Sequence, residues 1–251
     1  MHAESRRSFN RKLLGSLMTF GLIETLFVRD LFADQVKPVI RKWVVELHDL
    51  ARDLKDQKLK DVDFQAKLED LYRRADLPEL VNLVDLDRLA RSVKYPALGA
   101  ASLGVDLSQV EGLPKRVVLG KQIFALRKGR SVVPHGHNNM ATGFIVLRGD
   151  FVGKHYERVE DLEDHYLIKP TIDRVFKAGE YSTISDHKDN VHWFKADSDT
   201  GFIFNVHVIG YNAENPKPAG RVYVDPDGEK VAGGLIKAKV ISSAECHKKY
   251  G

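Results

Sequence analysis

Two histidines have the spacing of metal ligands. They are His135 and His137, within the stretch G-R-S-V-V-P-H-G-H-N-N-M-A-T-G-F-I-V-L-R-G that runs from 129 to 149. Side chains two residues apart on a β-strand project from the same face, with Cα atoms roughly 6–7 Å apart. Neutral imidazoles at that spacing can bind one divalent metal ion. The apolar run that ends at the Gly149-Asp150 turn predicts a second strand, so the pair is expected in β-structure rather than on a helix.

A third ligand has to come from the remaining histidines. His192 is the strongest candidate, because it begins the run V-H-W-F-K-A directly after the polar turn D-H-K-D-N. Two strands that lie opposite each other in a barrel can direct three imidazoles at one point. His187 lies in that turn and is expected to be solvated, although it could gate the site. His155 and His165 lie among charged residues and are predicted to be on the surface, whereas His207 is either a core residue or part of the pocket wall.

Composition excludes several other classes of site and partner. The only cysteine is Cys246, so an intramolecular disulfide and a Cys-rich zinc or iron–sulfur site are excluded, and any metal must be held by His or carboxylates. The formal charge of +4 is spread along the chain instead of forming a basic block, so nucleic acid is not an expected partner. An apolar content of 43% is ordinary for a globular protein and permits a large core.

Residues 1–33 have the layout of an export signal. A basic start containing Arg6-Arg7 precedes about 15 mostly apolar residues, which is shorter than the roughly 20 that a membrane span needs. The segment resembles a bacterial twin-arginine signal, which implies a periplasmic or membrane-associated protein, with membrane association through these residues. Glu24 interrupts the apolar run and no small-x-small cleavage site follows. An amphipathic first helix in a cytoplasmic protein is the alternative.

Residues 34–95 predict a small helical layer. Apolar residues recur at helical spacing among dense charges, at Val36, Ile40, Val44, Leu47, Leu50, Leu54, Phe64, Leu68 and Leu71. Pro78 is expected to begin a further short helix with Asp76 as its cap. We expect this layer to pack against the β-domain or against a partner subunit.

Residues 96–225 predict one mainly β domain. Short β-runs separated by Gly and Pro occur at 116–127, 132–137, 144–148, 151–157, 171–176, 181–185, 191–196, 202–209 and 221–224. Such spacing without intervening helices favours a closed or sandwiched antiparallel architecture such as a jelly roll. Residues 226–251 are predicted to be a tail, with a hairpin or irregular strand and then a mobile basic end.

The histidine segment resembles the first motif of the cupin superfamily, G-x5-H-x-H-x3,4-E-x6-G. Gly129, His135, His137 and Gly149 fall on its fixed positions, and Thr142 stands where the motif has Glu. The resemblance implies a double-stranded β-helix, or jelly roll, here with an N-terminal helical layer. The missing carboxylate removes the usual fourth ligand.

Within the cupins, the chain is most similar to the thiol dioxygenases of the cysteamine dioxygenase and plant cysteine oxidase group. P-H-G-H-N-N-M-A-T, R-G-D-F-V-G-K-H-Y, N-V-H-W-F-K-A and F-N-V-H-V-I-G-Y follow that group's motifs in order. The resemblance implies Fe(II) bound by His135, His137 and His192, with a small thiol and dioxygen as substrates and a sulfinate as product. The charged turn S-D-H-K-D-N and Asn205, where the group tends to have an acidic residue, are departures that leave the substrate open.

Three neutral imidazoles leave a divalent ion its full charge and open positions for an anionic thiolate and for dioxygen. Tyr156, Tyr181, Asn205 and His207 are the candidate catalytic residues that could orient either one. Zinc is the main alternative metal, since catalytic zinc commonly uses three His, and manganese or nickel are further alternatives. The competing functions are a cupin hydrolase or isomerase with one of these metals, and a metal-binding or sensory module without turnover.

Overall fold

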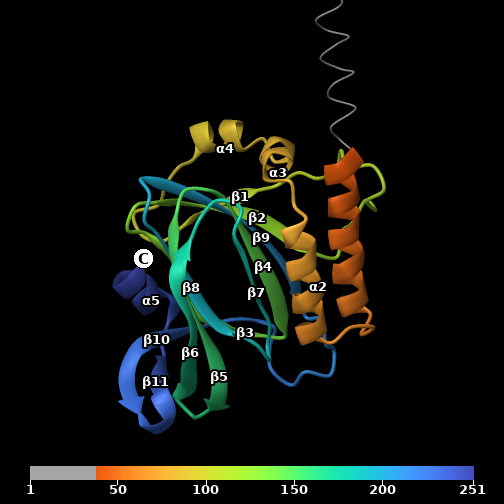
Figure 1. Cartoon of the computed structure of the whole chain (residues 1–251). Helices are drawn as coiled ribbons and strands as arrows, with labels where there is room; N and C mark the ends of the chain where they lie inside the picture. The colour runs from red at the N-terminus through yellow and green to blue at the C-terminus, as the bar shows by residue number, and fades with distance from the viewer. Residues whose placement is uncertain (1–37) are drawn as a thin grey trace, which may run out of the picture.

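The computed structural model describes residues 38–251. The predicted export signal at residues 1–33 lies outside them. The described part is mainly β, with two packed sheets and helices against the outer face of one of them (Figure 1). The predicted mainly β jelly-roll architecture with an N-terminal helical layer is confirmed. No helix in this part of the chain is long and apolar enough to cross a membrane.

The helical layer consists of helical residues 38–55, α2 (Asp61–Arg73), α3 (Leu77–Leu83) and α4 (Leu86–Ser92). The predicted cap is present, since the carboxylate of Asp76 accepts from the backbone N–H of Glu79 at 3.1 Å and Pro78 lies in the first turn of α3. The Trp43 indole N–H donates to the carbonyl of Leu71 at 2.8 Å and so joins the first two helices.

The helices pack on a five-stranded sheet in the order β1-β2-β9-β4-β7. Its strands are β1 (Ala101–Gly104), β2 (Gly120–Arg127), β9 (Thr200–Ile209), β4 (Met140–Arg148) and β7 (Tyr181–Ile184). Figure 1 shows α2 beside β4 and β7. A Cβ on Gly143 would lie 2.6 Å from the Leu68 side chain and 2.8 Å from that of Tyr72, so the glycine allows α2 to approach β4 closely.

Alternation along β9 gives this sheet two different faces. Phe202, Phe204, Val206 and Val208 belong to the core beneath the helices, whereas Ile203 belongs to the core between the two sheets. By the two-residue period of a strand, Asn205 and His207 share the inner face with Ile203.

The second sheet closes on itself in the order β10-β11-β6-β5-β8-β3. Its strands are β3 (Ser131–Asn138), β8 (Val191–Ala196), β5 (Phe151–Asp161), β6 (His165–Phe176), β11 (Leu235–Val240) and β10 (Gly220–Val231). It closes because β10 pairs with β3 through its first residues and with β11 through its last ones. The core between the two sheets is aromatic, with Phe124, Phe144, Phe151, Phe176 and Phe194.

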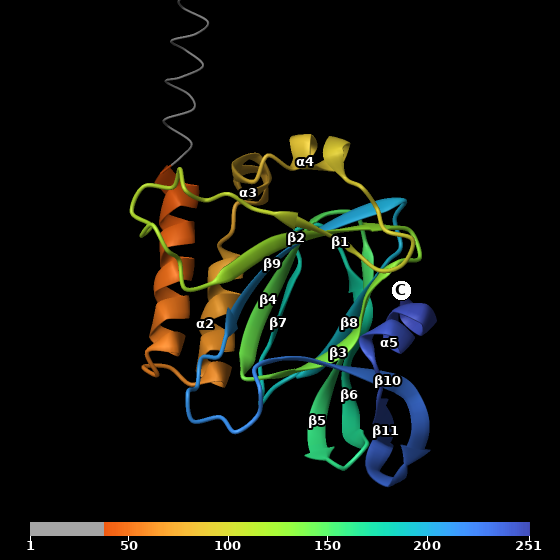
Figure 2. The ribbon, with the colours of Figure 1, turned by 180° about the vertical axis from the view of Figure 1, so that it is seen from behind.

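The C-terminal residues belong to this barrel instead of forming a tail after residue 225. Strand β10 continues through that position to Val231, the 3-10 turn Ala232–Gly234 follows, and β11 pairs with β6. The final helix α5 (Ser243–Tyr250) begins with a capping box of Ser242 and Glu245 and packs on β3 (Figure 2). Cys246 on α5 is fully buried. The basic C-terminal end is therefore ordered, because α5 packs on β3 with Cys246 buried. The sequence pattern does not predict this contact between α5 and β3.

Candidate metal centre

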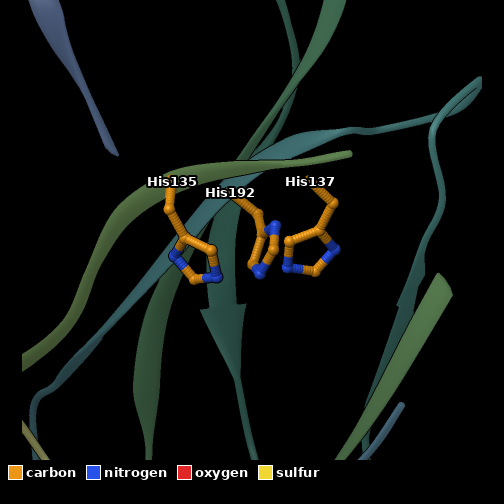
Figure 3. A group of neighbouring side chains, drawn as sticks. All are labelled: His135, His137 and His192. Atoms are coloured by element: carbon orange, nitrogen blue, oxygen red, sulfur yellow. The ribbon is translucent and has the colours of Figure 1, made fainter. Parts of the chain in front are cut away.

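Three imidazoles from two paired strands converge on one point. His135 and His137 come from β3, and His192 on β8 lies directly opposite His135 in the antiparallel register. The ring centroids lie 4.4 Å apart for His135 and His192, 4.9 Å for His137 and His192, and 5.1 Å for His135 and His137. One nitrogen from each ring lies within 4.8 Å of the others (Figure 3). This is the only such cluster of His, Cys, Asp or Glu among residues 38–251.

Backbone carbonyls determine the tautomers of two of the rings. Nδ1 of His135 lies 2.7 Å from the carbonyl oxygen of Val133, and Nδ1 of His192 lies 3.2 Å from that of Asn190. Because a carbonyl only accepts, Nδ1 must carry the proton in both rings, and Nε2 must present a lone pair. In metal-ligating histidines, the ring nitrogen that does not bind the metal typically donates to such a carbonyl or to a carboxylate.

The convergent nitrogens have no partner within the described protein. Four ring nitrogens are buried without a hydrogen bond: Nε2 of His135, Nε2 of His192 and both nitrogens of His137. Each of these three residues is at most 1% exposed. Buried polar atoms are normally satisfied, so a cluster of unsatisfied lone pairs needs an explanation. A divalent metal ion explains it, because three neutral imidazoles are a suitable donor set.

Burial keeps these imidazoles neutral. It lowers the pKa of His135 and of His192 well below the usual value, and it lowers the pKa of His137 to about 3. The neighbouring positive groups act in the same direction, above all Arg221 on His135 and His137, because a cation disfavours the imidazolium form. The site is therefore prepared to accept a cation without first losing protons.

A network of neutral polar groups covers the inner face of the opposite sheet. The Gln122 side-chain amide donates to Oδ1 of Asn205 at 3.2 Å, and the Asn205 amide donates to Oγ1 of Thr142 at 2.7 Å. Thr142 in turn donates to the carbonyl of Val206 at 2.7 Å. The position that holds a carboxylate in the cupin motif is thus a hydroxyl whose hydrogen bonds are used within its own sheet.

The structure places two of the candidate catalytic residues, Asn205 and His207, on this inner face. Nδ1 of His207 lies 3.3 Å from Oδ1 of Asn205 and donates to it, which leaves Nε2 as an acceptor. A Cβ on Gly120 would lie 2.0 Å from that Nε2, so only glycine leaves space for the ring. His207 also contributes to lowering the pKa of His137, so the wall and the metal centre are electrostatically coupled.

The structure places the other two candidates, Tyr156 and Tyr181, away from the three imidazoles. Tyr156 follows His155 along β5 and packs in the apolar cluster of Tyr166 and Val191, on the opposite face of the strand. Tyr181 packs against Tyr72 of the helical layer, with ring centroids 5.7 Å apart. The alternation of side chains along each strand directs both phenol groups out of the site.

His155 was predicted to be a surface residue, and that prediction is wrong. It is 0% exposed, lies opposite His192 on the neighbouring strand, and its ring centroid is 6.0 Å from that of His192. Its ring nitrogens lie 3.2 and 3.3 Å from Oγ of Ser182, and burial lowers its pKa to about 3. Lys154, the charged residue directly before it, projects from the other face of the strand and pairs with Asp173 at 3.0 Å. The alternation of Phe151, Gly153 and His155 was the available signal.

Two further residues of the site come from β10. Its register with β3 places Tyr223 opposite His135 and Arg221 opposite His137. Directly opposed residues of an antiparallel pair project to the same face, so both side chains lie on the face of the imidazoles. The Tyr223 ring lies 6.2 Å from that of His135. The sequence predicted a strand at 221–224, but nothing in it indicated pairing with β3.

Asn190 connects two of the imidazole-bearing residues. Its side chain accepts from the backbone N–H of His137 at 3.1 Å and donates to the carbonyls of His137 at 2.9 Å and Ser185 at 3.0 Å. A Cβ on Gly136 would lie 2.7 Å from Oδ1 of Asn190, so the glycine provides the space that this amide occupies. In the sequence Asn190 ends the polar turn D-H-K-D-N and begins the motif N-V-H-W-F-K-A, and neither pattern indicates these contacts.

A cavity of about 560 Å³ lies at the end of β3 beside His137. Its lining is mostly polar and includes Arg158, Asp186 and His187. The His187 side chain is 73% exposed, as expected for a residue in the turn, and its Nδ1 lies 2.8 Å from a carboxylate oxygen of Asp61 on α2. The turn between β7 and β8 therefore links the helical layer to the strand that carries His192.

Comparison with known proteins finds no matching family model and no matching curated relative. Solved structures do match, 308 chains in all. A cupin superfamily protein from Desulfitobacterium hafniense has 12% identity and a TM-score of 0.31, with 48% of this chain and 86% of that chain covered. A protein with a double-stranded β-helix domain from Klebsiella pneumoniae has 12% identity and a TM-score of 0.35, with coverage of 54% and 87%.

A recombinant oxalate oxidase in complex with glycolate matches at 16% identity and a TM-score of 0.35. That match covers 51% of this chain and 56% of the oxidase chain, so the alignment spans only about half of either protein. All three TM-scores lie below 0.5. What the site can do chemically therefore rests on its own geometry: a buried group of three imidazoles that fits a divalent metal ion.

Proposed function

We propose that this protein is a mononuclear non-haem iron dioxygenase that oxidises a small thiol to a sulfinate. The observation that carries the proposal is the donor set, in which three buried neutral imidazoles converge and a hydroxyl stands where the cupin motif has a carboxylate. A set without an anionic ligand leaves the charge of the metal to be balanced by an anionic substrate.

The reaction is balanced without a further reductant. One thiol and one dioxygen give one sulfinic acid, and both oxygen atoms are transferred to sulfur. Sulfur loses the four electrons that dioxygen gains. Bound Fe(II) supplies coordination positions for a thiolate and for dioxygen and favours the deprotonated thiol.

The residues of the chain hold and shield the reacting groups. The carbonyls of Val133 and Asn190 keep the rings of His135 and His192 in the tautomer that presents Nε2. Phe144 packs against the His192 ring at a centroid distance of 5.3 Å and contributes to excluding water. On the facing sheet, Nε2 of His207 is held as an acceptor and can receive a proton or a hydrogen bond from a substrate.

Oxygen consumption tests the proposal. Protein loaded anaerobically with Fe(II) is mixed with a panel of thiols that includes cysteamine, cysteine, 3-mercaptopropionate and 2-mercaptoethanol. We expect oxygen uptake with at least one of them, and a product heavier than its thiol by two oxygen atoms. His192→Ala should abolish the uptake, whereas His165→Ala, at a half-buried histidine at the start of β6 that is not part of the cluster, should not. Absence of oxygen uptake with every thiol would refute the proposal.

A zinc enzyme is the second candidate, because three imidazoles and one open position are also the donor set of catalytic zinc. Elemental analysis of protein purified without added metal separates the two. Iron supports the dioxygenase, whereas stoichiometric zinc with hydrolytic activity supports the alternative. Manganese or nickel would indicate other cupin chemistry. Tight metal binding that depends on His135, with no substrate consumed, would indicate a metal-binding module.

A further inference from the structure

The three imidazoles are closed off from solvent. His135 and His137 are 1% exposed, and His192 is 0% exposed. A metal ion or a small ligand can therefore reach them only if part of the surrounding structure moves. The cavity of about 560 Å³ beside His137 is a void that adjoins the cluster, so a movement of one of its walls would open a path.

The walls of this cavity differ in how they are held. His137 and Asn138 belong to β3, and residues 158–161 belong to β5, so strand pairing fixes both of these walls. Another wall comes from residues 213–219, here called the strap, which connect β9 to β10 without regular secondary structure. The strap lies in the blue loop between β9 and β10 in Figure 2. It is the wall that can move without breaking a strand pair.

Two side chains hold the strap against the cavity. Lys217 forms an ion pair with Asp161 at the end of β5, and the Asn215 amide donates to the carboxylate of Asp186 in the β7–β8 turn at 3.3 Å. All four residues line the cavity, and the two contacts are here called the latch. The side chain of Lys217 is 51% exposed and that of Asp161 is 32% exposed. An ion pair that is open to water in this way is weak.

Releasing the latch leaves no buried group unpaired. Asp161 keeps two contacts with the Arg158 guanidinium, at 2.5 and 2.6 Å. Asp186 keeps the backbone N–H groups of Asn139 at 2.6 Å and Met140 at 3.2 Å. The lysine and the asparagine of the strap are solvated instead. Because the costly part of breaking a polar contact is a buried partner left unsatisfied, the latch can open at low cost.

The two ends of the strap have different attachments. Before it, the backbone N–H of Asn212 donates to Oδ1 of Asn139 at 2.8 Å, and its carbonyl accepts from Nδ2 of the same residue at 2.7 Å. After it, Gly220 has a φ of +144°, a conformation that favours glycine. Pro216 and Pro218 fix φ within the strap. A stiff segment with one anchored end and a glycine at the other is suited to move as a unit.

We propose that the strap is a hinged cover whose latch controls access to the three imidazoles through the cavity beside His137. In the closed position, Lys217 and Asn215 hold the strap against the cavity. When the latch is released, the strap turns outward about its two ends and opens the path to the cluster. The inference goes beyond the proposed function, because it concerns entry to the metal centre and holds for any reaction there.

Exchange kinetics of Co(II) test the proposal, because the visible absorption of the ion reports its binding to the imidazoles. Rapid mixing measures association, and transfer to excess chelator measures dissociation. Lys217→Ala should raise both rate constants by about 2- to 5-fold, and the double variant with Asn215→Ala should raise them by about 5- to 50-fold. The dissociation constant should stay at the wild-type value, since the strap opens in the same way with and without metal.

Lys237→Ala is the matched control. Lys237 on β11 forms an exposed ion pair with Glu229 at 2.9 Å and does not line the cavity, so its loss should leave both rate constants at the wild-type value. Salt provides a second comparison. Raising the ionic strength weakens the ion pair of Lys217 and should accelerate exchange more in wild type and in Lys237→Ala than in Lys217→Ala, which lacks the pair.

Unchanged rate constants in the double variant would show that metal enters by another route and would overturn the proposal. A faster dissociation with unchanged association, and therefore a weaker affinity, would mean that the strap holds the ligands in place instead of controlling access, and would also overturn it. Neither result depends on oxygen uptake. Failure of the dioxygenase proposal would therefore leave this inference intact, and the reverse also holds.

Discussion

Asn190 binds both polar groups of the His137 backbone, accepting from its N–H at 3.1 Å and donating to its carbonyl at 2.9 Å. The backbone carbonyl of the same asparagine accepts from Nδ1 of His192. One residue therefore fixes the positions of imidazoles on two different strands. Because a metal site requires its ligands at defined distances, this connection should determine metal affinity without direct contact with the metal.

We expect Asn190→Ala to weaken metal binding by about 10- to 100-fold, the usual effect of losing a residue that orients a ligand. Competition with a chelator of known affinity measures the change. Asn215→Ala is the matched control, because its amide contacts Asp186 and no imidazole of the cluster. Unchanged metal affinity in Asn190→Ala would show that β3 and β8 alone hold the ligands.

Metal should stabilise the folded protein. The unpartnered nitrogens of His135, His137 and His192 are adjacent only in the folded state, so a metal that binds there raises the free energy of unfolding by about 2.7 kcal/mol at 100 times its Kd. Thermal unfolding with and without Fe(II), Co(II) or Zn(II) measures the shift in Tm. His192→Ala should lose the shift, and His247→Ala, a residue of α5, should keep it. A shift that survives His192→Ala would place the metal elsewhere.

The metal-free protein should lose stability in acid. His137 and His155 have folded-state pKa values of about 3, below the unfolded value of about 6.5, so the unfolded chain binds more protons in that interval. Their contribution is fully present above about pH 6.5 and is lost as the pH falls towards about 3. Denaturant titrations across this range should show the decline.

His155→Gln isolates one of these groups. Removing one histidine that titrates only in the unfolded state should reduce the slope of stability against pH by about 1.4 kcal/mol per pH unit between pH 6 and about 4. The slope is the relevant readout, because the substitution also changes the overall stability by altering the contact with Ser182. An unchanged slope would mean that His155 is protonated in the folded protein.

Thr142→Val separates folding from metal binding. The substitution conserves shape but removes the hydroxyl that accepts from Asn205 and donates to Val206, so we expect a loss of about 1–3 kcal/mol in the free energy of unfolding. Metal affinity should stay at the wild-type value, because that hydroxyl is already bound within its own sheet. A tenfold loss of metal affinity would assign Thr142 to the metal centre instead.

The features that the sequence by itself determined are local. The spacing of His135 and His137 on one strand follows from the two-residue period, and the cap at Asp76 follows from the preference of helix ends for a short polar side chain. The position of His192 at the start of the apolar run V-H-W-F-K-A, directly after a polar turn, was also sufficient to select it. Each of these patterns is contained within a few residues and needs no partner to be interpreted.

Only the tertiary structure decided which residues surround the three imidazoles. Strand pairing brings His155, Tyr223 and Arg221 to the site from β5 and β10, whereas Tyr156 and Tyr181 lie on the other faces of their strands. A shift of one residue in register moves every side chain of a strand to the opposite face. Register depends on contacts between segments far apart in the chain, and for this reason the ligands could be predicted from the sequence while the groups around them could not.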